Sequence, residues 1–122
     1  MIQIPIDEAG AFDMLSILQI KATHKLPVLS EIAVMEHSIR MAIGLPKFME
    51  IIESQEYLDL ANENRKMWEI QEWSMRDMCK SSVVDAQNQC RYHAKQALQR
   101  KFFGGELTEQ KTVRPYEQVE TK

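Results

Sequence analysis

Residues that break helices are scarce in this chain, and they stand at the ends of long stretches with helical periodicity. Four glycines and four prolines occur among 122 residues. Between them, apolar side chains recur every three or four positions, for example at Phe12, Leu15 and Leu18, and this spacing places them on one face of a helix. Because the pattern covers most of the chain, we predict an all-α fold.

The breakers and the capping residues divide the chain into five helical segments. These segments are, to within a few positions, residues 7–25, 27–43, 46–52, 54–80 and 82–103. The predicted architecture is therefore a compact bundle of four to five helices. Residues 1–105 are expected to form a single domain. Residues 106–122 are polar and follow Gly104 and Gly105, so we expect a C-terminal tail that is extended or disordered.

Charge and hydropathy exclude two classes of partner. The chain has 18 acidic and 15 basic residues, a net charge of −3, which argues against a nucleic-acid partner. No apolar stretch approaches the ~20 residues that cross a bilayer, and the N-terminus lacks the basic and apolar segments of a signal peptide. We therefore predict a cytoplasmic protein with no nucleic-acid partner and no membrane partner.

The histidines do not have the spacing of metal ligands. A di-iron site in a helical bundle needs a glutamate three residues before a histidine on each of two helices. The residues at that position before the three histidines are Lys21, Val34 and Cys90. The two cysteines form no CxxC pair. We predict no metal and no cofactor.

Polar residues on three of the predicted helices could meet in a ligand site. They are Asp13 and Lys21 on the first helix, Trp68, Glu72 and Arg76 on the fourth, and Asn88, Arg91 and Lys95 on the fifth. If these faces converge, four cations and two carboxylates lie beside a tryptophan. Such a site would suit a small anionic or sugar-bearing ligand, because arginine binds phosphate and carboxylate in a bidentate manner. The alternative explanation is an ion-pair network between helices, and the catalytic residues stay unknown.

Two pairs of glutamates leave an enzymatic alternative open. Glu50-x-x-Glu53 and Glu69-x-x-Glu72 each place two carboxylates on one helical face, where together they could hold Mg²⁺. This arrangement resembles the ExxE and ExxD motifs of all-α nucleoside-triphosphate pyrophosphohydrolases. Solvated helix faces rich in glutamate also produce it by chance. A chorismate-mutase-like site would need an arginine on the first helix, and residues 7–25 contain none.

Three blocks of the sequence carry a resemblance to a known group of proteins. The blocks are Ile4-Pro5-Ile6 with Asp13-x-Leu15-Ser16-Ile17-Leu18-Gln19-Ile20-Lys21, then Asn64-Arg65-x-x-Trp68-x-Ile70-Gln71-Glu72 with Arg76, and Asn88-x-x-Arg91-x-x-x-Lys95 with Gly105-Glu106-Leu107-x-Glu109-x-Lys111. In these blocks the chain resembles a small bacterial family of uncharacterised all-helical proteins. That family has no established activity, so the resemblance implies a helical fold and leaves the function open.

Apolar residues surround the whole circumference of the fourth predicted helix. Trp68, Trp73 and several methionines lie on different faces of it, more than one neighbouring helix would cover. We therefore predict a two-fold homodimer, the commonest symmetry of oligomers. The leading hypothesis is a non-catalytic binding or accessory module that dimerises and binds a small anionic ligand or a protein partner. Whether the protein is an enzyme stays open.

Overall fold

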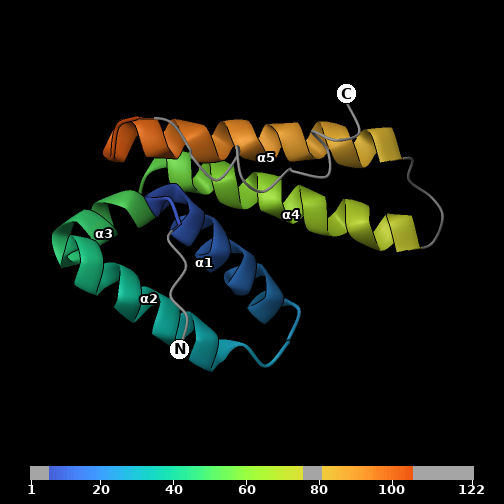
Figure 1. The fold of residues 1–122 in the computed structure, drawn as a ribbon. Helices are drawn as coiled ribbons and strands as arrows, with labels where there is room; N and C mark the ends of the chain where they lie inside the picture. Colours follow the sequence, from blue (N-terminus) through green and yellow to red (C-terminus); the bar gives the residue numbers. More distant parts are fainter. Residues whose placement is uncertain (1–5, 76–80, 106–122) are drawn as a thin grey trace.

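The computed structural model describes residues 6–75 and 81–105, and these residues form five α-helices and no strand (Figure 1). The helices are α1 (Glu8–Thr23), α2 (Leu29–Ile43), α3 (Leu45–Ile52), α4 (Gln55–Met75) and α5 (Ser81–Phe102). The prediction of an all-α bundle is confirmed. The predicted tail, residues 106–122, lies outside the described residues, as do residues 76–80 at the end of the fourth predicted helix. No helix within the described ranges combines the length and the apolar character that crossing a bilayer requires.

The longest helices, α4 and α5, lie side by side, and the other three helices build outward from them (Figure 1). Helix α1 packs against both α4 and α5, whereas α2 packs mainly on α1 and α3. The short α3 leads the chain from α2 back to α4. Helix α2 consequently lies at the outer edge of the bundle, with a large part of its circumference unpacked.

Two helix boundaries show how local chemistry sets the chain path. Gly44 separates α2 from α3 at φ 89°, a conformation that side chains disfavour, so a glycine is needed there. Ser54 precedes α4, and its hydroxyl oxygen accepts a hydrogen bond from the backbone N–H of Tyr57 at 3.1 Å. Serine in this position satisfies a backbone donor at the helix start that would otherwise have no partner.

An aromatic cluster forms the centre of the core. Phe12 on α1 is 1% exposed, and three rings surround it: Phe48 and Tyr57, each 6.0 Å away between ring centroids, and Phe103 at 6.5 Å. The aliphatic residues packed in the same core are Ala9, Leu15, Ile39, Ile51, Leu60 and Leu98. The predicted inner face of the first helix is confirmed at Phe12 and Leu15.

Several methionines do not lie in the core, although their spacing predicts that they should. Met67 is buried, but Met41 is 74% exposed and Met49 is 40% exposed. Met14 on α1 is 46% exposed. For Met41 and Met49 the physical reason is the peripheral position of α2 and α3, because no further helix covers the outer sides of these elements within the described residues.

The buried Tyr57 makes the stability of the fold depend on pH in the alkaline range. Its hydroxyl donates a hydrogen bond to Gln19 Oε1 at 2.7 Å. Burial raises the pKa of Tyr57 above its ordinary value, and the charges of Glu36 and Asp13 raise it further. The unfolded chain therefore loses the Tyr57 proton first as the pH rises through about 10. Ionisation of Tyr57 in the unfolded chain therefore lowers the free energy of unfolding by up to about 1.4 kcal/mol per pH unit above that point.

We expect Tyr57→Phe to lose about 1 kcal/mol at neutral pH, since Gln19 loses its donor, and to show a shallower fall in stability above pH 10. The measurement is urea unfolding between pH 8 and 11. The matched control is Tyr92→Phe, a change at the half-buried tyrosine of α5. This variant should lose stability above pH 10 as steeply as the wild type. An equally steep alkaline loss in Tyr57→Phe would contradict the assignment.

Candidate functional site

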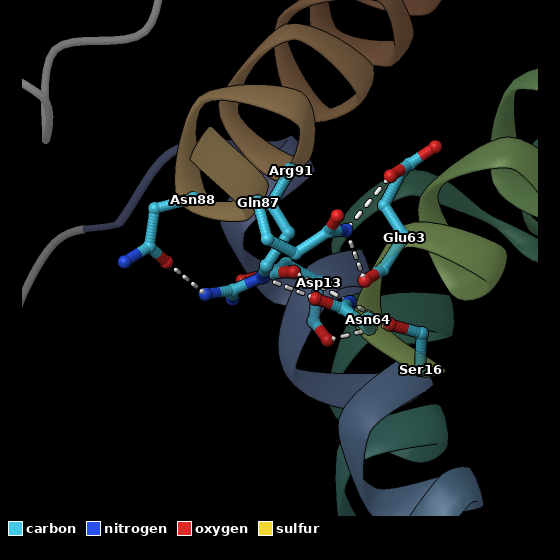
Figure 2. Close-up of polar contacts among 7 residues, drawn as sticks. All are labelled: Asp13, Ser16, Glu63, Asn64, Gln87, Asn88 and Arg91. Carbon is cyan, nitrogen blue, oxygen red and sulfur yellow. Dashed lines mark hydrogen bonds and ion pairs between the residues drawn. The ribbon is translucent and has the colours of Figure 1, made fainter. Parts of the chain in front are cut away.

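A polar cluster joins α1, α4 and α5 inside the bundle. Asn64 Nδ2 donates hydrogen bonds to Asp13 Oδ1 at 2.8 Å and to Ser16 Oγ at 2.6 Å. Arg91 Nε donates to Asn64 Oδ1, and Arg91 Nη2 forms an ion pair with Asp13 Oδ2 at 3.3 Å. Figure 2 shows Arg91 reaching from α5 toward the α1 and α4 residues, with Asn64 between Asp13 and Ser16. Asn64 therefore contacts every other member of this group, which we call the Asn64 cluster.

Helix geometry places the members of the Asn64 cluster. Asp13 and Ser16 are three residues apart on α1 and share one face, and the Ser16 hydroxyl donates to the Asp13 carbonyl at 2.8 Å. On α5, Arg91 Nη1 donates to Asn88 Oδ1, one turn earlier, at 3.2 Å. The exposed fractions of Asp13, Ser16 and Asn64 are 8%, 1% and 4%. Each of these buried polar side chains is satisfied by another, which is the arrangement that a stable interior requires.

A second polar contact continues from the Asn64 cluster along the α4–α5 interface. Gln87 Nε2 donates to the backbone carbonyl and to Oε1 of Glu63, both at 2.8 Å (Figure 2). Gln87 is 8% exposed. This side chain ties α5 to α4 one turn before Arg91, so the two helices are aligned by polar contacts as well as by apolar packing.

The structure brings some of the predicted site residues together and leaves others apart. Asp13 and Arg91 meet in the Asn64 cluster, and Asn88 adjoins it through its hydrogen bond from Arg91. Lys95 lies one turn beyond Arg91 and is half-buried. Burial lowers the pKa of the Lys95 ammonium, and the charge of Asp13 partly opposes this shift. Within the described part of the chain, Lys21, two turns further along α1, forms no hydrogen bond or ion pair with the cluster.

Trp68 lies beside the Asn64 cluster rather than in it. Its ring stacks on His24 at 4.7 Å between centroids. With Arg91 and Asn64 it borders a cavity of about 100 Å³, whose other lining residues are Ile17, Ile20, Met67 and Gln71. The other two predicted residues, the Glu72 side chain and Arg76, lie outside the described part of the chain.

Asn64 and Ser16 belong to the cluster although the polar faces in the sequence did not predict them as site residues. Asn64 stands among apolar positions on the inner seam of the fourth helix, between Ala61 and Trp68. An amide in such a seam must find buried partners, and that was the available signal. Ser16 carried no comparable signal, because serine is common on any helix face.

The predicted magnesium site has little support from the described residues. Glu50, Glu53 and Glu69 are all exposed. No group of three or more His, Cys, Asp or Glu side chains in the described residues is close enough to hold a metal ion. The fourth glutamate of the proposed set, Glu72, has a side chain outside the described part. The pyrophosphohydrolase hypothesis thus stays a sequence-based alternative.

A long apolar groove follows the line between α1 and α2. One hollow of about 250 Å³ is lined by Ile6, Asp7, Glu8, Ala11, Phe12, Met35, Ser38, Ile39, Ala42 and Ile43. A second hollow of about 560 Å³ is lined by Met14, Leu18, Ser30, Glu31, Val34, Met35 and Ser38. Because both hollows share Met35 and Ser38, they form one continuous feature, which we call the α1–α2 groove.

The outer side of α2 adds apolar surface beside the α1–α2 groove. Leu29, Val34 and Met41 are 73%, 66% and 74% exposed. A helix exposed on its outer face ordinarily carries charged or polar residues there. Within the described residues, the most exposed large apolar side chains lie on α2. Trp73, on which the prediction of excess apolar surface on the fourth helix rests, has a side chain outside the described part of the chain.

The chain matches no protein-family model, no curated protein and no solved structure. The resemblance to a bacterial helical family therefore stays a prediction.

Proposed function

We propose that this protein is a non-catalytic helical binding module that docks another protein on the surface formed by α1 and α2. The observation that carries the proposal is the exposure of Val34 and Met41, which lie seven residues apart on one face of a helix packed mainly on one side. Apolar side chains gathered on an exposed surface are typical of sites where a partner packs. The proposed module acts in the cytoplasm, and a second copy of the chain is one candidate partner.

The polar residues of the bundle support the non-catalytic part of this proposal. Arg91 donates to Asn64, Asn88 and Asp13, so much of its hydrogen-bonding capacity is used inside the protein. Such a cluster fixes the relative positions of α1, α4 and α5, which a binding module needs. A small-anion site at Arg91 is the weaker alternative.

Affinity capture with matched variants tests the proposal. The wild-type chain and a Leu58→Glu control should retain the same partner, because Leu58 is exposed on α4, away from the proposed surface. Val34→Glu and Met41→Glu place a carboxylate on that surface and should each weaken the purified partner's binding by 10-fold or more. A burial cost of about 1.4 kcal/mol corresponds to a tenfold change in affinity.

The binding constant is measured with the purified partner by titration calorimetry, and sedimentation velocity of the chain alone tests a homodimer. If every captured partner binds Val34→Glu and Met41→Glu as tightly as the wild type, and self-association is also unchanged, the proposed docking surface is wrong. Circular dichroism of each variant verifies that the helices remain formed.

A further inference from the structure

The charged side chains that line the α1–α2 groove are all acidic. Asp7 and Glu8 border the hollow at the start of α1, and Glu31 borders the hollow near the start of α2. Neither lysine nor arginine occurs among the described residues that line these two hollows. Lys25 lines a separate hollow at the loop between α1 and α2. The groove therefore has an apolar floor with acids at its border.

The walls of the α1–α2 groove have the spacing that receives a third helix. Ala11, Met14 and Leu18 lie three and four residues apart on α1, and Met35, Ser38 and Ala42 repeat that spacing on α2. Rows of side chains with this spacing form ridges, and a helix packs by laying its own ridges between them. Helix-in-groove binding uses the same geometry.

We propose that the α1–α2 groove binds an amphipathic helix of another protein, with its apolar face on the groove and lysine or arginine along its flanks. This inference rests on the proposed binding function and specifies the partner. The length follows from α2, whose 15 residues span about 22 Å at 1.5 Å per residue. A partner helix of about four turns covers this length. Its basic flanks lie near Asp7, Glu8 and Glu31.

A second copy of this chain fits the groove less well. In a two-fold dimer the same surface meets itself, so the grooves of two copies would bring their acids toward one another. Like charges across an interface weaken association. Opposite charges favour it, and they also speed the encounter at low salt. The acidic border therefore selects a basic partner over an identical one.

Two synthetic peptides test the proposal with the full-length chain. Each has about 16 residues and the same leucine stripe at positions i, i+3, i+4 and i+7, but one carries lysine on its flanks and the other glutamate. We expect the lysine peptide to bind at least 10-fold more tightly by fluorescence anisotropy at ~50 mM salt, where surface charges are weakly screened. Ser38→Arg, at the junction of the two hollows, should weaken its binding at least 10-fold. Leu58→Arg, on exposed α4, should leave it unchanged.

A charge reversal adds an independent measurement. Glu31→Lys should weaken the lysine peptide several-fold and strengthen the glutamate peptide. If the wild type binds both peptides equally and Ser38→Arg abolishes both, the basic-partner inference is overturned while the proposed function stands. If neither peptide shows binding that depends on Ser38, the groove is not the docking site. Self-association that Ser38→Arg abolishes would assign the groove to a second copy and overturn the inference as well.

Discussion

Phe12→Ala is expected to lower the free energy of unfolding by about 4 kcal/mol, the largest loss at any single position considered. Phe12 projects from α1 into the core, where its ring contacts Phe48, Tyr57 and Phe103. Truncation removes the edge-to-face contact with Tyr57 and leaves a cavity that three rigid rings cannot collapse to fill. Domains have a free energy of unfolding of about 5–15 kcal/mol in total, so the variant should retain only a small part of its stability.

Urea unfolding followed by circular dichroism measures this loss, with the denaturant slope verifying that the transition stays two-state. Phe12→Leu is the milder companion for the case in which Phe12→Ala does not fold, and it should cost about 1.5 kcal/mol. Leu58→Ala removes an apolar side chain that is 52% exposed and should change stability by less than about 0.5 kcal/mol. A Phe12→Ala loss as small as that of Leu58→Ala would show that Phe12 is not central to the core.

The same aromatic cluster shows why the fold could be predicted from the sequence. Spacing of Phe12 and Leu15 identified the inner face of the first helix, and both are buried. Breakers such as Gly44 identified the ends of the helices, because glycine and proline act through the local backbone. The predicted start at Pro27 differs from the observed start at Leu29 by two residues, the ordinary uncertainty of helix ends.

The packing of one helix on another could not be predicted in this way. Periodicity identifies the residues that share a face, but it does not identify the neighbour that covers that face. Met14 and Met41 are apolar residues in segments with helical periodicity, a pattern that favours the core, yet they are 46% and 74% exposed. The α1–α2 groove depends on the angle and distance between two helices. The periodicity within either helix does not predict that geometry. The Asp13–Arg91 pair was partly predictable, because both residues lie on polar faces expected to converge.

Arg91→Met is expected to lower the free energy of unfolding by about 3 kcal/mol. The Asp13 side chain is 11% exposed and Arg91 is its ion-pair partner, so the substitution removes the guanidinium that contacts Asp13 Oδ2 and weakens the compensation of a buried carboxylate. It also removes the donor to Asn64 Oδ1. Arg65→Met is the matched control, because Arg65 is an exposed arginine on α4, and it should change stability by less than about 0.5 kcal/mol.

The double variant Asp13→Leu with Arg91→Met separates the interaction energy of the ion pair from the loss of stability caused by removing only one partner. Replacing both charged partners with apolar residues of similar size should cost less than the two single changes together, with a coupling of about 1–3 kcal/mol measured by urea unfolding. Additive losses would mean that Asp13 and Arg91 act on the fold independently. An Arg91→Met variant as stable as Arg65→Met would mean that Arg91 contributes nothing to holding the three helices together. A half-buried arginine that does not stabilise the fold would then favour the anion-binding hypothesis over the structural one.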